Sequence, residues 1–362
     1  MDEDNKCLKI WQIFVIDIFE VKLVKKCLIF FTVYFIFFLI LQVLSFVRKA
    51  SVNYFVQFGP TFFIIVYLIL CIVTLYFSSP LIVASTKYMR SWKVPVNQQW
   101  KRQYDQNLLL VTVYLVVTLS LGMITAFFYV MPTEQDKQVF FENDVAEAYF
   151  PQWQNFVIWL SKIGFVPLTY ISIVQPSLRI VYGWMHAKFH IYNCLFFLKN
   201  MTGDDREIAR SLKFCLRYHV EITLIVRKIL RGVQIYVLPF QIVGTVLIAN
   251  VAIYYFWFQD VLTDQYLRIF SLGITAFTIL FGLAQSGQAI EDVSDNVLDV
   301  LINLDWCDWS ESNKKMYLMF LVNTQRQFKM KYSEDISLNY KMGVEMVKTF
   351  FSIISVMSRL QK

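Results

Sequence analysis

The feature that most constrains this chain is an uncharged run at residues 28–47, which reads LIFFTVYFIFFLILQVLSFV. About 20 consecutive apolar residues are what a helix needs to cross the hydrocarbon core of a bilayer. The whole chain agrees with this assignment: 57% of its residues are hydrophobic and only 17% are charged, whereas a soluble domain carries about 25% charged residues. The composition therefore predicts a chain whose main solvent is lipid.

Six further stretches have a comparable apolar character. We therefore predict an all-α, polytopic membrane protein with seven transmembrane helices. The predicted spans are 28–47, 61–83, 108–130, 156–182, 233–258, 269–285 and 342–360. The last one contains Lys348, so it should face protein or water rather than lipid.

The basic residues fix the expected orientation of these spans. If the N-terminus lies in the cytosol, the cytosolic segments contain 25 Lys and Arg residues and the extracellular segments contain only six. The inside segments are 1–27, 85–106, 188–231 and 288–341, and the outside segments are 48–60, 132–154, 259–268 and 359–362. This bias predicts a cytosolic N-terminus and an extracellular C-terminus. The net charge of +7 thus follows membrane topology and does not indicate nucleic-acid binding.

Two of the inside segments have helical periodicity of their own. In 288–331, six apolar residues share one helix face: Ile290, Val293, Val297, Val300, Leu301 and Leu304. Such stripes need partners, so we expect a cytosolic helical anchor. The predicted organisation is a cytosolic N-terminal segment (1–27), six spans with long cytosolic extensions between the fourth and fifth (28–287), anchor helices (288–341) and a last helix (342–362).

Several functional classes find no support in the sequence. It has no GxSxG, HExxH or Walker motif, so we expect neither an enzyme nor a cofactor. The six cysteines form no CxxC, and His186 and His190 have no third ligand nearby, so no metal site is predicted. A G-protein-coupled receptor would have the opposite orientation. A transporter remains an alternative, although the first three spans contain no Asp or Glu for ion coupling.

The C-terminal 160 residues resemble the insect odorant receptor family. The resemblance rests on short segments within 209–256 and 285–361, namely LKFCLRYH at 212–219, LPFQ at 238–241, NLDW at 303–306, NKKMYLMFL at 313–321, TQR at 324–326, KMK at 329–331 and TFFSII at 349–354, together with Gly287 and Glu291. The chain departs from the family pattern at Gln327, Tyr332 and Phe350, which leaves the pore geometry open.

The resemblance implies a function. Members of this family are ligand-binding subunits of odour-gated, non-selective cation channels in the plasma membrane of olfactory neuron dendrites. They form heterotetramers with an odorant co-receptor, Orco, bind small volatile organic ligands and line the pore with the last helix. The related gustatory receptors, which assemble without that co-receptor, are the alternative. The C-terminal sequence motif of the gustatory receptors is incomplete in this chain, because Val356-Met357 stands where that motif has Gln-Phe.

The resemblance also implies candidate ligand-binding residues, because the ligand site of this family lies in the outer halves of spans two, three, four and six. The candidates are Phe63, Tyr67, Thr125, Phe128, Trp159, Phe165, Tyr170, Phe270, Gly273 and Phe277. The alternative for each residue is ordinary bundle packing, although a buried hydroxyl or indole N–H favours a polar partner. For the pore gate, Ile353, Val356 and Leu360 share one face of the last helix. Four copies of this apolar ring could close a pore by dewetting.

Overall fold

The computed structural model describes residues 17–48, 98–133, 140–170, 174–257, 266–325 and 337–360, with Ile13 and scattered positions between 62 and 88. Every regular element in these parts is helical, in agreement with the predicted all-α class. Most of the predicted second span, including Phe63, lies outside the described residues.

The helices follow one another in a simple order. They are η1 (Asp17–Glu20), α2 (Lys22–Arg48), α4 (Gln98–Val130), α6 (Phe141–Tyr149), η2 (Pro151–Trp153), α7 (Gln154–Lys162), α8 (Phe165–Thr169), α9 (Gln175–Lys199), α10 (Asp205–Trp257), α11 (Tyr266–Ile302), α12 (Glu311–Thr324) and α13 (Tyr340–Leu360). Three described helices are long and apolar enough to cross a membrane: 22–48, 105–130 and 267–302.

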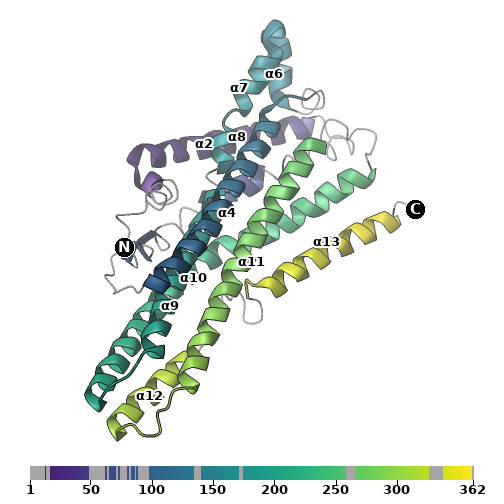
Figure 1. The fold of residues 1–362 in the computed structure, drawn as a ribbon. Coiled ribbons are helices and arrows are strands. Elements are labelled where there is room, and N and C mark those ends of the chain that lie inside the picture. The colour runs from purple at the N-terminus through teal and green to yellow at the C-terminus, as the bar shows by residue number, and fades with distance from the viewer. Residues whose placement is uncertain are drawn as a thin grey trace.

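Four long helices build the body of the molecule, with α11 packed on α9 and α4, and α10 packed on α9 (Figure 1). At 1.5 Å per residue, the 53 residues of α10 extend about 80 Å and the 37 residues of α11 about 55 Å. Both exceed the roughly 30 Å hydrocarbon core of a bilayer. The predicted sixth span is therefore only the first half of α11, which continues without a break into the segment expected to form a separate anchor helix.

The predicted fourth span is not one helix. It is divided into α7, α8 and α9, with a break between Lys162 and Phe165. A Cβ on Gly164 would lie 3.2 Å from the ring of Phe35, so this glycine lets α2 approach closely. Pro167 then removes a backbone donor in the short helix α8. These two residues explain the interruption, which hydropathy alone does not reveal.

The predicted outside segment 132–154 contains α6 and η2, which together with α7 form a small lobe at one end of the molecule (Figure 1). Three of its polar side chains, Glu142, Asn143 and Lys162, are buried. Glu142 is buried, with Ser161 Oγ 3.1 Å from its Oε1, and Lys162 Nζ lies 4.1 Å from the centroid of the Phe140 ring. Aromatic side chains of η2 and α7, such as Trp153 and Phe156, point outward.

At the opposite end, α12 packs on α10 and α11. The apolar stripe predicted in 288–304 is what holds this end together: Ile290, Val297 and Leu301 are fully buried, and Tyr317 of α12 donates a hydrogen bond to the Leu301 carbonyl at 3.0 Å. The helix α13 packs against α10 and α11 and then diverges from the bundle (Figure 1).

Candidate ligand-binding site

Two threonine hydroxyls meet where α4 packs on α11. Thr125 Oγ1 and Thr275 Oγ1 are 2.8 Å apart, and both side chains are buried. Thr275 also donates to the Ser271 carbonyl at 2.8 Å, as helical threonines commonly do. Thr125 was predicted as a site residue, whereas its partner was not. The pair places hydroxyl groups in an otherwise apolar interface, where they can orient a polar group of a ligand.

Arg268 closes the same interface near the first residue of α11. Its Nε donates to the carbonyl of Phe128 at 2.9 Å, and its guanidinium also bonds the carbonyl of Met131. The guanidinium carbon lies 5.7 Å from the centroid of the Tyr129 ring. A cation at the C-terminal end of α4 satisfies carbonyls that have no partner within the helix and is favoured by the helix dipole.

Further along this interface, α4 and α11 approach very closely. A Cβ built on Gly282 would lie 2.2 Å from the hydroxyl oxygen of Tyr114. Only glycine at this position leaves room for the tyrosine ring. Thr118 and Ser177 are fully buried in the same part of the bundle, where α4 also packs on α9.

Besides Thr125, three predicted pocket residues lie within the bundle. Tyr67 is buried in the main apolar core, which also contains Phe35 and Phe38 of α2. Tyr170 is half-buried and packs against the core shared by α4 and α9. Phe128 is half-buried beside the Arg268 contact. These residues and Thr125 are the predicted positions that lie within the bundle.

The other predicted pocket residues lie on the outside of this chain. Phe270 and Phe277 are 68% and 62% exposed, and Gly273 has open space around the position of a Cβ. Trp159 is 37% exposed and stacks on Phe156, with 6.2 Å between ring centroids. The structure therefore does not bring these four residues together with Tyr67. The side chain of Phe165 lies outside the described part.

The predicted gate residues lie on α13. Ile353 is half-buried and Val356 is 55% exposed, whereas the side chain of Leu360 is outside the described part. The beginning of α13 is tied to α11, because Asn339 Nδ2 donates to Glu291 Oε2 at 3.1 Å and the Tyr340 hydroxyl bonds Gln285.

The second half of α9 and the first part of α10 share a buried polar layer. His190 Nδ1 lies 2.6 Å from the hydroxyl of Tyr218, and burial raises the pKa of that tyrosine. The neighbouring His219 packs against Phe320 of α12, with 5.4 Å between ring centroids. Burial lowers the pKa of His219 to about 4, so this histidine is neutral at physiological pH.

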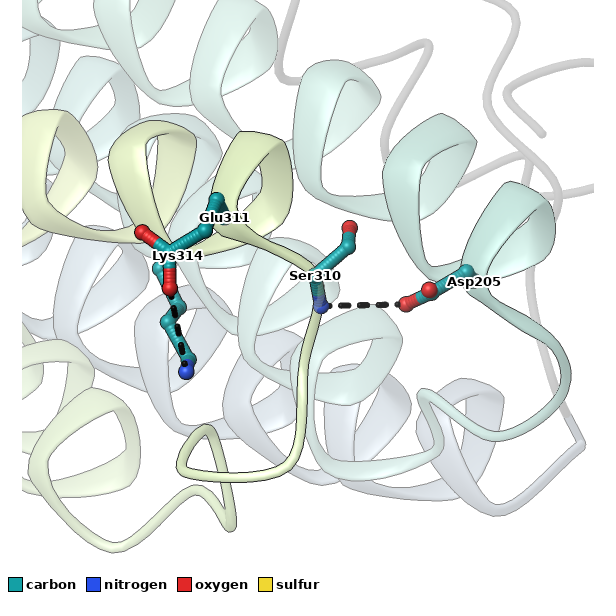
Figure 2. Close-up of polar contacts among 4 residues, drawn as sticks. All are labelled: Asp205, Ser310, Glu311 and Lys314. Atoms are coloured by element: carbon teal, nitrogen blue, oxygen red, sulfur yellow. Dashed lines mark hydrogen bonds and ion pairs between the residues drawn. The ribbon is translucent and has the colours of Figure 1, made fainter.

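A second polar contact joins the start of α10 to the start of α12 (Figure 2). The Ser310 backbone N–H donates to Asp205 Oδ1 at 3.3 Å, and Asn313 Nδ2 donates to the Asp205 carbonyl at 2.9 Å. Lys314 Nζ lies 3.5 Å from Glu311 Oε1, an ion pair within α12 (Figure 2). Asp205 thus connects segments more than 100 residues apart in the chain.

Sequence reasoning missed Arg268, Thr275, Gly282 and Asp205. Arg268 is the last residue of the predicted outside segment 259–268, immediately before the predicted sixth span. Gly282 had a sequence signal as well, because a glycine in an apolar helix often marks close packing. For Thr275 and Asp205 no local signal exists, since their partners are distant in sequence.

Comparisons with known proteins agree with this architecture. The family model described as 7tm Odorant receptor matches residues 195–351. A search of curated protein sequences finds no match to the chain.

Among solved structures, the insect olfactory receptor OR5 from Machilis hrabei in complex with eugenol is similar, with a TM-score of 0.75 and 10% identity over 91% of this chain and 88% of that one. A second structure of the insect olfactory receptor OR5 from Machilis hrabei gives a TM-score of 0.72 and 12% identity, and the match covers 91% of this chain and 87% of that one. Residues 195–351 therefore match the odorant receptor family model, and the chain shares its fold with an insect olfactory receptor.

Proposed function

We propose that this chain is the ligand-binding subunit of an odour-gated, non-selective cation channel that works with the odorant co-receptor Orco. The observation that carries the proposal is the match to the odorant receptor family model over 195–351, the region that contains the inner helical assembly and most of α13. In the proposed assembly, four chains form a heterotetramer around a central pore in the plasma membrane of an olfactory neuron dendrite.

The proposed topology has seven spans, with the N-terminus in the cytosol and the C-terminus outside. The distribution of 25 against six basic residues supports it. In this orientation, α6 and α7 lie on the extracellular side. The inner parts of α9, α10 and α11, together with α12, form the cytosolic anchor. An epitope tag at the C-terminus should bind antibody on intact cells. Binding only after permeabilisation would contradict the orientation.

The proposed ligand is a small volatile organic molecule held among the outer halves of the helices. Tyr67, Thr125 and Tyr170 are the site residues that the interior position supports best, because their hydroxyls lie within an apolar bundle. Thr275 joins this group through its contact with Thr125. Phe63, Phe128 and Phe165 remain proposed lining residues. Trp159, Phe270, Gly273 and Phe277 remain candidates only if the ligand is reached from the surface of the chain.

The proposed gate is an apolar ring contributed by α13. Val356 is exposed in the single chain, as a side chain that faces a central pore must be, and Ile353 and Leu360 complete the same helix face. Substituting Val356 with Ser should raise the basal leak or alter ion selectivity. Unchanged leak and unchanged selectivity would remove Val356 from the gate.

The experiment that tests the function is whole-cell recording during an odorant panel that includes eugenol, with this chain expressed alone and together with the co-receptor. Odour-evoked cation current only in the pair is the expected result. Current from this chain alone would contradict the need for a co-receptor and favour a self-assembling channel of the gustatory type. Tyr67→Phe should shift ligand potency while surface expression stays normal.

A further inference from the structure

Three exposed cations form a compact patch on α10. Arg227, Lys228 and Arg231 are all exposed. Residues three and four positions apart lie on the same face of a helix, so the three side chains leave α10 on one side. We name Arg227, Lys228 and Arg231 the α10 basic patch.

The positive charge of this patch is not balanced nearby. No Asp or Glu occurs between 222 and 259. The acidic residue that precedes this stretch, Glu221, lies 3.2 Å from Arg217 and is engaged in that ion pair. Within the part of the chain that the structure describes, no hydrogen bond or ion pair joins the three cations to another residue. The patch therefore presents three positive charges to its surroundings.

The position of the patch indicates what those surroundings are. Arg231 lies two residues before the predicted fifth span, 233–258, and α10 continues from one into the other without a break. The exposed Leu224 lies less than one turn before Arg227, so the surface around the patch is partly apolar. Lys and Arg at such a boundary lay their stems along apolar surface and place their charges at headgroup depth. This step rests on the topology given under Proposed function.

We propose that the α10 basic patch binds the headgroups of anionic phospholipids in the inner leaflet. Two guanidinium groups suit a phosphate, because each can donate two parallel hydrogen bonds to its oxygens, and Lys228 adds a third positive charge. Anionic lipids are concentrated in the cytoplasmic leaflet, the side that the basic residues predict for this end of α10. The site is separate from the proposed odorant site and the proposed gate.

The test measures retention of phosphatidylserine and of a phosphoinositide by the purified full-length chain in a zwitterionic detergent, using native mass spectrometry. The site variant is R227Q/K228Q/R231Q. The chain offers a matched control, R206Q/R210Q/K213Q, which removes three exposed charges from the same helix. Its nearest change, at Lys213, lies 14 residues or about 21 Å along the helix from Arg227, well over twice the Debye length of about 8 Å in physiological salt.

The proposal predicts that the site variant loses anionic lipid, by about fivefold for each cation removed, whereas the control retains it. Phosphatidylcholine retention should be equal in all three proteins. Equal loss in both triple variants would mean a general effect of net charge and would overturn the proposal, as would unchanged binding in the site variant. Displacement of the lipid by an equal concentration of free inositol phosphate would also overturn it, because the ligand of the site would then be a free phosphate compound rather than a lipid.

Two further measurements separate loss of the lipid site from misfolding and from failure of the proposed function. If the triple variant does not give a monodisperse protein, R231Q alone should still weaken lipid retention about fivefold against K213Q. The assay needs no channel opening, so it does not depend on the proposed odour response. Normal odour-evoked current with unchanged lipid retention in the site variant would refute only the lipid site.

Discussion

In the topology proposed above, the outer half of the bundle and the inner helical assembly, which consists of the inner parts of α9, α10 and α11 with α12, use the same secondary structure in opposite ways. In α4 and the first half of α11, apolar residues such as Leu110, Phe270 and Phe277 face outward, and the threonine hydroxyls face inward. In the inner parts of α10 and α11, Ile222 and Val297 are fully buried, and charges point outward. The reversal occurs within single continuous helices. It shows that one set of helices is built for two solvents, lipid and water.

The stability of the two regions should therefore depend on different interactions. Burial of apolar surface away from water drives the inner assembly. Between apolar helices in lipid that force is absent, so close packing and hydrogen bonds between helices carry more of the stability. Four substitutions test this difference.

Phe320→Ala should give the largest effect. The Phe320 ring is fully buried between α12 and α10, so its truncation should cost about 3–5 kcal/mol. We expect a marked fall in the midpoint temperature of thermal aggregation, measured by fluorescence-detected size-exclusion chromatography, and loss of surface expression. Met319→Ala is the matched control on the same helix, because Met319 is exposed and should tolerate the change. Similar losses in both variants would contradict a packed core under α12.

His219 should make the inner assembly sensitive to acid. Its pKa is about 4 in the folded chain, below the usual value of 6.5, so the unfolded state binds a proton more readily. The stability that neutral His219 provides is present above pH 6.5 and is lost as the pH falls from there towards 4, by up to about 3 kcal/mol. His219→Gln should remove this part of the pH dependence of the midpoint temperature. An unchanged pH profile in the variant would show that His219 is not a buried neutral group.

Gly282→Ala tests close packing in the outer bundle. The new methyl group would collide with the Tyr114 ring, so we expect a loss of about 1–3 kcal/mol and a lower midpoint temperature. Combining it with Tyr114→Leu should restore part of the loss. Gly273→Ala is the matched control in the same helix, because nothing lies within 4 Å of the added carbon. If the control is as harmful as Gly282→Ala, helix approach is not the cause.

The Thr125–Thr275 contact should give the smallest effect, about 1 kcal/mol. Either single change to Val leaves the other buried hydroxyl with one partner fewer, whereas the double change removes both hydroxyls together. We expect the double variant to lower the midpoint temperature by less than the sum of the decreases in the two single variants. Additive losses would mean that the two hydroxyls do not interact.

Sequence reasoning succeeded where the signal was continuous and local. The uncharged run at 28–47 predicted α2, and the stripe from Ile290 to Leu304 predicted an apolar face that the structure buries. It failed where a helix is interrupted inside an apolar stretch, as at Gly164, because hydropathy does not register backbone breaks. It also failed for Thr275 and Asp205, since periodicity does not identify partners 150 and 105 residues away.

The candidate site was less predictable than the fold. Aromatic residues are so frequent here that the pattern did not separate inward from outward positions, and Phe270 and Phe277 prove to lie on the surface of the chain while Tyr67 lies in the core. Which face of an apolar helix is buried depends on its neighbours. In lipid both faces carry similar residues, so the sequence alone holds little information about the choice.

Thiol labelling of two single-cysteine substitutions tests the two-solvent organisation most directly. Lys213→Cys on α10 and Phe277→Cys on α11 are compared in a chain whose Cys7, Cys27, Cys71 and Cys307 are replaced by Ser, so that the buried Cys194 and Cys215 are the native thiols that remain. The reagent is a membrane-impermeant maleimide. We expect labelling at position 213 only after the cells are permeabilised, and little labelling at position 277 under either condition. Labelling at 213 on intact cells, or strong labelling at 277, would contradict the two-solvent organisation.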